Sequence, residues 1–250
     1  MNLKVSTRYQ DMNKTIYMTY KKYIPFVVIQ RWKQLNPEYK IDFSLDTDCV
    51  DFLEKHINSE VAALFNRISI GMYKADLWRL CKLYVYGGVY ADVDIVPRVP
   101  IDSLLTGATF ISSIGMNNIS IFQAFMIVTR PKHPLILQFL MSLIQTQPFD
   151  IPNGPTKDMY TCLTQNIPVI SPGITYPIHE IRIPKGDRQL WRPSEYLEDD
   201  IVIPCKESVY LFKETIDPES HWSKCYIVDK GVRIMDSRDQ NYYLNGGWWF

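Results

Sequence analysis

Apolar and polar positions follow strand-like and helix-like patterns in turn through the first quarter of the chain. Residues 15–20 are β-branched and aromatic, and residues 39–45 alternate between apolar and polar, so both stretches are expected to be strands. Residues 25–35 and 46–56 have helical spacing, with Asp46 or Thr47 as the expected N-cap of the second helix. This order of strand, helix, strand and helix predicts a parallel sheet with crossover helices.

A third helical pattern carries two charged residues on one face. Apolar residues at 77, 80, 81 and 84 follow the i, i+3, i+4, i+7 spacing of an amphipathic helix, which is expected to end at Gly87-Gly88. Asp76 and Arg79 lie three residues apart and share a face of this helix. Taken alone, they have the spacing of a surface ion pair worth only about 0.3 kcal/mol.

The two glycines are followed by an alternating stretch that contains two aspartates. Valine, alanine and isoleucine at 89, 91, 93 and 95 alternate with Tyr90, Asp92 and Asp94. In a strand, this alternation places both carboxylates on one face, and the glycines would let a ligand approach the backbone. We expect Asp76, Arg79, Asp92 and Asp94 to converge at the carboxyl end of the sheet as an active site.

The remaining pattern predicts further strands and helices and no second domain. Strands are expected at 109–113 and 121–129, a core helix at 131–145, and another helix after the turn at 153–156. After residue 166 prolines recur and the periodicity weakens, which indicates short strands and loops.

Composition narrows the class of protein. The 27 basic and 27 acidic residues balance, which argues against nucleic acid as an obligate partner. Five cysteines without a CxxC spacing argue against a disulfide framework or a structural zinc site, and favour a reducing compartment. No apolar run is long enough to span a bilayer, and the first residues lack the apolar region of a signal peptide. We therefore expect a soluble, cytoplasmic protein without a transmembrane segment.

Two aspartates on one strand face need a positive partner. Residues i and i+2 lie about 7 Å apart at Cα, so unpaired carboxylates there repel each other. Mg²⁺ or Mn²⁺ resolves this conflict, because these cations prefer oxygen ligands and commonly bind one or two carboxylates together with substrate phosphates. Asp92 and Asp94 are therefore candidate metal ligands.

The composite motif resembles a known family. Residues 76–94, together with 36–39 (NPEY), 153–155 (NGP) and 221–223 (HWS), are similar to glycosyltransferase family 32, the sugar transferases that contain a DxD motif, and more distantly to the large clostridial glucosylating toxins. The resemblance implies one α/β domain of the GT-A, Rossmann-like type over residues 1–250, with a mainly parallel central sheet flanked by helices and the DxD at the end of a strand. Residues 15–130 would bind the nucleotide-sugar, and residues 131–250 would form the acceptor side and close the site.

The resemblance also implies an activity and residue roles. The protein would be a metal-dependent hexosyltransferase that moves a sugar from a UDP- or GDP-sugar to a hydroxyl acceptor with retention of configuration. Asp76 and Arg79 would hold sugar hydroxyls, Asp92 would contact the ribose or sugar, and Asp94 would bind Mn²⁺ or Mg²⁺. The metal and cationic donors would stabilise the leaving diphosphate. Because no further carboxylate stands out as a nucleophile, attack by the acceptor hydroxyl on the same face is the preferred mechanism.

Further residues enter the site by position within the family pattern. His221 would complete the metal shell, and Trp222 would close over the donor. Thr19 and Tyr20 would contribute to the nucleotide-base pocket. Tyr90 would either contact the donor or pack on the sheet.

The aromatic residues Trp248, Trp249 and Phe250 have several interpretations. They would pack into the core, line the cleft, or mediate homodimerisation or membrane contact. The acceptor remains open between a glycan, a lipid and a protein side chain. The resemblance and the lack of an anchor suggest a bacterial or viral enzyme.

Two other functions compete with sugar transfer. The sequence from Asp92 to Val96 also satisfies the signature of haloacid-dehalogenase phosphohydrolases, in which the first aspartate is a nucleophile, although that motif normally follows the first strand. A non-catalytic module that binds a nucleotide-sugar is the second alternative.

Overall fold

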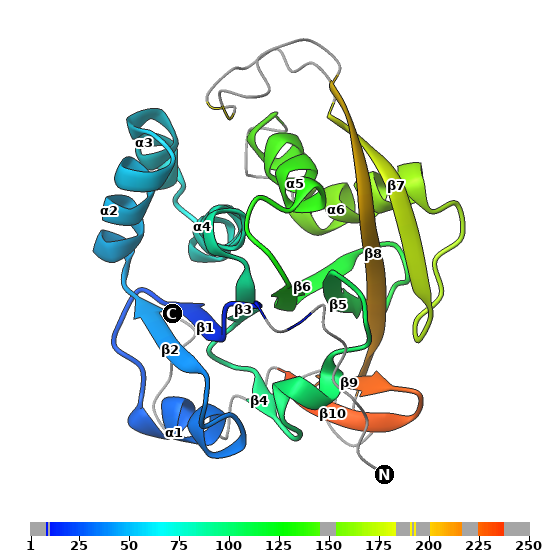
Figure 1. Ribbon diagram of the computed structural model, residues 1–250. Coiled ribbons are helices and arrows are strands. Elements are labelled where there is room, and N and C mark those ends of the chain that lie inside the picture. Colours follow the sequence, from blue (N-terminus) through cyan, green and yellow to red (C-terminus); the bar gives the residue numbers. More distant parts are fainter. Residues whose placement is uncertain are drawn as a thin grey trace.

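The computed structural model describes residues 9, 11–145, 154–183, 191, 193, 201–216 and 225–237, and shows a curled sheet with helices packed against it (Figure 1). The described elements are, in chain order, β1 (Thr15–Thr19), α1 (Phe26–Leu35), β2 (Lys40–Ser44), α2 (Asp46–His56), α3 (Ser59–Arg67), α4 (Gly71–Tyr86), β3 (Gly88–Ala91), β4 (Val96–Pro97), the 3₁₀ helix η2 (Ile101–Leu104), β5 (Phe110–Ile114), β6 (Ile121–Val128), α5 (Pro134–Gln145), α6 (Gly154–Asn166), β7 (Thr175–Ile183), β8 (Ile201–Ile216), β9 (Cys225–Asp229) and β10 (Val232–Ser237).

The sheet is mixed rather than mainly parallel. Its strand order is β2-β1-β3-β6-β5-β8-β9-β10-β4, with β7 paired to β8. The pairs β1–β2, β1–β3 and β5–β8 are parallel, and the other six are antiparallel. The expectation of a mainly parallel sheet is therefore wrong. A short connection such as residues 115–120 joins antiparallel neighbours, and the apolar pattern of a strand does not encode its direction.

The sheet separates two hydrophobic cores. Helices α2 to α6 pack in the core that contains Tyr17 and Tyr90, and these helices occupy the upper part of Figure 1. Trp32 of α1 packs in the other core with Val89 and Ala91. Successive residues of a strand point to opposite faces. Tyr90 therefore faces helix α4, which carries Arg79, while Val89 and Ala91 face the other core.

Several elements differ from the expectation. Helix α3 has no counterpart in the pattern analysis, and β8 is 16 residues long where short strands were expected. The cap position of α2 is Leu45 rather than Asp46 or Thr47, and the backbone N–H of Leu45 donates to the Asp48 carboxylate at 2.8 Å. Long pairing with β5, β7 and β9 on both sides of β8 overrides its weak local pattern.

The strand that was expected over 89–95 ends at Ala91. The N–H of Asp92 still bonds to the carbonyl of Ala124 on β6 at 2.8 Å, but the N–H of Ile95 turns back to the carbonyl of Asp92 at 3.1 Å. Asp92 and Asp94 therefore lie in a turn after the strand and not on one strand face.

Gly87 and Gly88 serve chain packing rather than ligand approach. Both have positive φ, +62° and +96°. A Cβ on Gly87 would lie 2.9 Å from the backbone carbon of Arg130, and one on Gly88 would lie 3.0 Å from the carbonyl oxygen of Thr15. The interpretation that these glycines admit a ligand is wrong, because they stand at the start of β3, at the opposite end from Asp92.

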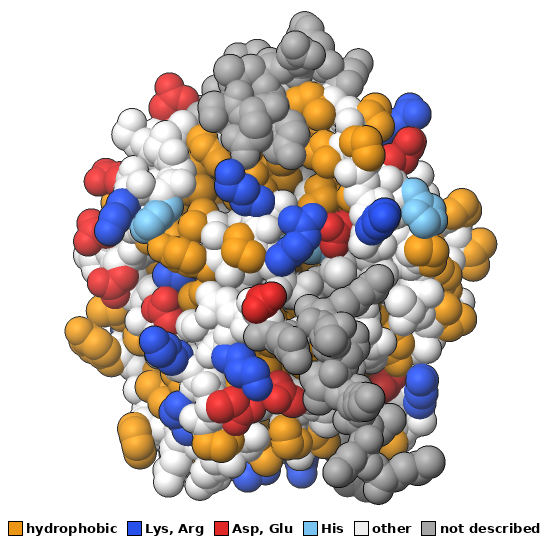
Figure 2. All heavy atoms as spheres, in the orientation of Figure 1, with side chains coloured by type: hydrophobic (Ala, Val, Ile, Leu, Met, Phe, Trp, Pro, Cys, Tyr) orange, Lys and Arg blue, Asp and Glu red, His pale blue; other side chains and the backbone are white. Residues whose placement is uncertain are grey.

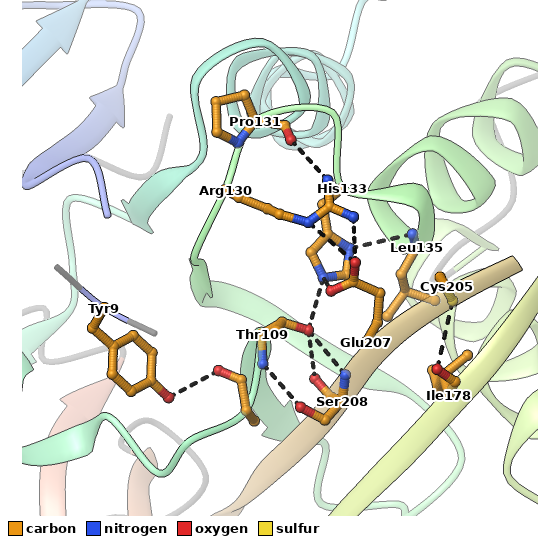
Figure 3. Close-up of polar contacts among 11 residues, drawn as sticks. Tyr9, Thr109, Arg130, Pro131, His133, Leu135, Ile178, Cys205, Glu207 and Ser208 are labelled. Carbon is orange, nitrogen blue, oxygen red and sulfur yellow. Dashed lines mark hydrogen bonds and ion pairs between the residues drawn. The ribbon is translucent and has the colours of Figure 1, made fainter. Parts of the chain in front are cut away.

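A buried polar cluster joins β5, α5 and β8 (Figure 3). His133 lies 3.0 Å from Glu207 and 3.1 Å from the hydroxyl of Thr109, and its Nδ1 accepts from the N–H of Leu135. Arg130 also pairs with Glu207. Burial lowers the pKa of His133. Burial alone would raise the pKa of Glu207, but hydrogen bonds from His133 and Arg130 contribute to lowering it to about 2. His133 thus has a structural role in joining these elements.

The surface mixes both charges. On the face drawn in Figure 2, basic and acidic side chains are interspersed with apolar ones, in keeping with 27 residues of each sign. Among the described helices, none combines the length and the apolar character that crossing a bilayer requires.

Candidate active site

A cavity of about 480 Å³ opens at the carboxyl ends of three neighbouring parallel strands. Thr19 at the end of β1 pairs with Ser44 at the end of β2, and the register of β1 with β3 brings Asp92 to the same edge. Ligands bind at such an edge because loops and helix starts surround it. The lining residues are Thr19, Tyr20, Lys21, Ile24, Pro25, Val28, Asp46, Phe65, Ser69, Ile70, Gly71, Met72, Lys74, Ala75, Arg79, Asp92, Val93 and Asp94.

Arg79 is the buried cation beneath this cavity. Its Nη2 lies 3.1 Å from Asp76 and 3.4 Å from Asp92, and its Nη1 donates to the carbonyl of Gln123 at 2.5 Å. Its Nε donates to the carbonyl of Ala75 at 3.2 Å. The side chain is only 4% exposed, so the guanidinium is held in one orientation by groups on α4, β6 and the turn after β3. The pair of Asp76 and Arg79 is therefore not a surface ion pair.

Tyr90 connects Arg79 to the first aspartate of the turn. Its hydroxyl donates to Oδ1 of Asp92 at 2.5 Å, and its ring lies 4.3 Å from the guanidinium carbon of Arg79. Trp78 packs edge-on against the same ring at 6.4 Å. Tyr90 is fully buried and is not among the lining residues, so its geometry suits orientation of Asp92 more than contact with a ligand.

Burial and charge perturb the titration of these groups. Burial raises the pKa of Asp76 to about 6, although Arg79 opposes the rise. Burial also works against the charge of Arg79, but Asp92, Tyr90 and Asp76 together raise its pKa above the ordinary value. Perturbed buried groups beside a cavity are typical of functional sites.

Asp92 and Asp94 both reach the cavity. The side chain of Asp92 is 32% exposed, so it touches Arg79 on one side and the cavity on the other. The pKa of Tyr20 is raised by partial burial and by the negative charge of Asp94, which places that carboxylate near the phenol. Thr19, Tyr20, Arg79, Asp92 and Asp94 thus line one cavity, while Asp76 contacts Arg79 and is not among the lining residues.

Two cavity residues were not anticipated from the sequence. Lys74 on α4 lies 2.8 Å from the carboxylate of Asp46 and 4.9 Å from the ring centre of Phe65. Asp46 opens α2 directly after β2, so it stands at the carboxyl end of a parallel strand. The position of Asp46 after a parallel strand, rather than its potential as a helix cap, is the sequence feature that could have indicated a place in the site.

Some expected site residues cannot be placed. His221 and Trp222 lie outside the described residues, as do Trp248, Trp249 and Phe250. Their roles stay predictions.

Other parts of the family pattern are structural. Asn36 accepts from the N–H of Ile101 at 2.7 Å, and Tyr39 donates to Asp102 at 2.7 Å. These contacts fasten η2 to the loop after α1, away from the cavity-lining residues.

The chain is similar to known sugar transferases. Residues 27–111 match the family described as "Glycosyltransferase sugar-binding region containing DXD motif". The "Initiation-specific alpha-1,6-mannosyltransferase" of Candida albicans is 32% identical over 94 residues, which is 36% of this chain and 24% of the relative. The "Inositol phosphoceramide mannosyltransferase 1" of Schizosaccharomyces pombe is 39% identical over 84 residues, which is 32% of this chain and 24% of the relative.

A viral relative and a solved structure complete the comparison. The "Uncharacterized glycosyltransferase L373" of Acanthamoeba polyphaga mimivirus is 27% identical over 103 residues, 41% of each chain. The solved "PaToxG Glycosyltransferase" is 16% identical with a TM-score of 0.48 and covers 66% of this chain and 73% of its own. The match thus spans about a quarter of the length of each of the two fungal relatives.

The region that matches the family contains Asp76, Arg79, Asp92 and Asp94, and it supplies most of the cavity lining. Residues 27–111 of this chain are thus similar to the glycosyltransferase sugar-binding regions that contain a DXD motif.

Proposed function

We propose that this chain transfers a sugar from a nucleotide-sugar to a hydroxyl acceptor with the help of a divalent cation. The observation that carries the proposal is the convergence of Arg79, Asp92 and Asp94 on one cavity inside the region that matches a sugar-binding family. A cavity of about 480 Å³ is within the range of small-molecule sites. Sugar, diphosphate and nucleoside each offer polar groups that such a lining can bind.

The donor set fits Mn²⁺ or Mg²⁺ bound together with phosphates. Among the described residues, no group of three or more His, Cys, Asp and Glu is placed to hold a metal ion. Asp94 and Asp92 supply hard oxygen ligands, and a hard cation commonly combines one or two carboxylates with substrate phosphate oxygens. We assign Asp94 as the main ligand, with Asp92 and His221 as additional ones. The cation would neutralise charge on the diphosphate leaving group.

The buried residues would set the position and charge of Asp92. The phenol of Tyr90 and the guanidinium of Arg79 both contact its Oδ1, which fixes the direction of that carboxylate. Arg79 is itself held by Asp76 and by the carbonyl of Gln123. Donor-sugar hydroxyls would bind at this edge, to Asp92 and to the guanidinium, with Asp76 acting through Arg79. Because these groups are already oriented, binding requires little rearrangement.

Retention by attack on the same face is consistent with the lining. The carboxylates among the lining residues are Asp46, Asp92 and Asp94. Asp46 is paired with Lys74, and the other two are already assigned to the cation and to the donor. In the proposed step, the acceptor oxygen bonds to the anomeric carbon as the bond to the diphosphate oxygen breaks, and the hydroxyl proton passes to the leaving diphosphate. Both residues of the Asp46 and Lys74 pair would bind polar groups of the substrates.

A donor panel tests the proposal. UDP- and GDP-sugars are added with and without Mn²⁺, and the melting temperature is followed, since a donor that binds the native state raises it. Because two relatives are named mannosyltransferases, a mannose donor comes first. Asp94→Ala should abolish both the metal-dependent shift and the transfer or hydrolysis of sugar. The matched control is Asp51→Ala, which changes an exposed aspartate of α2.

The outcomes separate the competing functions. Wild-type rates of transfer by Asp94→Ala would refute the assigned role. A donor shift without transfer or hydrolysis would indicate a binding module. Phosphate release from an aryl phosphate, abolished in Asp92→Asn, would instead support a phosphohydrolase.

A further inference from the structure

Exposed apolar side chains lie on two segments that contribute residues to the cavity lining. The described residues include ten exposed large hydrophobic side chains, and five of them are Tyr23, Phe26, Val27, Ile70 and Met72. Tyr23 is 79% exposed, Phe26 is 73% exposed and Met72 is 64% exposed. Isolated exposed apolar residues are ordinary, but a cluster of this size marks a contact surface.

The five residues come from two segments that border the same cavity. Ile24 and Pro25 line the cavity from the segment before α1, and Ile70 and Met72 line it from the start of α4. Tyr23 and Phe26 are the immediate neighbours of the first pair. We call these five exposed side chains the apolar rim. Because two of the five line the cavity and the other three adjoin residues that line it in sequence, a surface that covers the rim would lie close to the site.

Basic residues flank the apolar rim. Lys21 and Lys22 directly precede Tyr23, and Arg67 ends α3 three residues before Ile70; all three are exposed. Of the acidic residues that line the cavity, Asp46 is already paired with Lys74. A solvent-facing surface that combines aromatic and aliphatic side chains with lysine and arginine is complementary to the headgroup region of an anionic lipid bilayer.

We propose that the apolar rim docks on the surface of an anionic lipid bilayer, so that the hydroxyl acceptor is presented to the cavity at a membrane. This inference rests on the proposed sugar transfer, which it deepens by naming a membrane-bound class of acceptor. Tyr23, Phe26 and Met72 would enter the interface between headgroups and acyl chains. Lys22 and Arg67 would contact lipid phosphates. A neutral bilayer would satisfy only the first of these two interactions.

The charge contribution can be tested separately from the apolar one. Each basic residue near an anionic membrane contributes about fivefold to binding, so Lys22→Gln with Arg67→Gln should weaken binding about 25-fold. Tyr23→Ser with Phe26→Ser should weaken it at least as strongly, because two exposed aromatic side chains are lost. The matched control is Val169→Ser with Val232→Ser, which removes two exposed apolar side chains outside the cavity lining.

The experiment is flotation of the full chain with vesicles of phosphatidylcholine alone or with about a third phosphatidylserine. We expect binding to the anionic vesicles, loss of binding in both rim variants, and wild-type binding in the control. The donor-induced melting shift of Tyr23→Ser with Phe26→Ser should equal that of the wild type. This second measurement separates failure of the docking from failure of the proposed function.

Three results would overturn the inference. The first is an absence of binding to anionic vesicles by the wild type. The second is equal binding by wild type and both rim variants. The third is a wild-type dimer in sedimentation that Tyr23→Ser with Phe26→Ser converts to a monomer without any vesicle binding, which would make the rim an interface between copies of the chain.

Discussion

Replacing Asp76 by asparagine should make the protein more stable and less active. Asp76 is buried, and its pKa is raised to about 6 by burial in spite of the Arg79 guanidinium 3.1 Å away. Asparagine has nearly the same shape and keeps an oxygen that can accept from Arg79, but it carries no charge that burial penalises. The substitution therefore isolates the free energy of ionising this carboxyl in the folded protein.

The magnitude follows from the pKa. A carboxyl with a pKa of 3.8 when unfolded and about 6 when folded holds its proton more tightly in the folded protein. Stability from this group is therefore fully present below pH 3.8 and falls as the pH rises toward 6. Above that pH, Asp76 costs the wild type about 3 kcal/mol, which Asp76→Asn removes. For a chain of this length, that corresponds to a rise in melting temperature of about 6 to 12 °C.

The assay is urea unfolding of wild type and variants at several pH values from about 2 to 8. The free-energy difference between them should grow across pH 4 to 6, while transfer activity falls about tenfold or more because Arg79 loses a charged partner. Asp102→Asn is the control of opposite sign. Burial of Asp102 opposes ionisation, but hydrogen bonds from Tyr39 and Lys14 lower its pKa. That variant should lose stability at neutral pH, and the loss should shrink as the pH falls below 3.8. A difference between wild type and Asp76→Asn that stays constant over pH 4 to 8 would refute the reasoning.

Three other substitutions test the surrounding structure. Gly87→Ala should destabilise the fold by about 2 kcal/mol or more in thermal unfolding, because φ is +62° and the new Cβ would lie 2.9 Å from the Arg130 backbone. The control Gly71→Ala should not destabilise it in this way, because a Cβ there meets nothing within 4 Å. Equal losses of stability in both variants would contradict this account. Glu207→Gln should cost about 3 kcal/mol in urea unfolding at pH 7, since a pKa lowered from 4.5 to about 2 stabilises the folded state above pH 4.5. The gap to wild type should close as the pH falls from 4.5 toward 2, and a gap that is independent of pH would argue against an ionised Glu207. Lys74→Met should weaken donor binding roughly tenfold in calorimetry, because a cation that lines the cavity is lost. The loss of stability should stay below about 1 kcal/mol, because the partner Asp46 is 43% exposed. An unchanged donor affinity would show that Lys74 does not bind the donor.

Local patterns predicted most elements because they depend on near neighbours in the chain. The spacing of apolar residues located α1, α2, α4, α5 and α6 within a few residues of their observed bounds, and β1, β2, β5 and β6 likewise. The same patterns could not indicate which strands pair or in which direction. The strand β8, which pairs with β5, β7 and β9, was accordingly missed as a long strand.

In the candidate site too, some contacts follow from local spacing and others depend on the tertiary fold. Asp76 and Arg79 share a helix face through their spacing, and the structure joins them at 3.1 Å. The approach of Asp92 to Arg79 at 3.4 Å depends on β3 lying beside β1, with Tyr90 turned toward α4. Asp46 and Lys74 line the cavity because α2 and α4 lie around the ends of the parallel strands in the folded chain. Their sequence separation of 28 residues leaves no local signal of the contact.

By itself, the sequence determined that this chain carries a DxD motif after a helix with Asp76 and Arg79, and with it the expected class of chemistry. Residue type and short spacing suffice for that, because the affinity of carboxylates for hard cations is intrinsic to the groups. Only the tertiary structure decided that Arg79 is buried, that Tyr90 contacts Asp92 from outside the cavity lining, and that Tyr23, Phe26 and Met72 stay exposed on segments that line the cavity. Burial, pKa and surface clustering are properties of residues distant in sequence, and they arise only when the sheet brings those residues together.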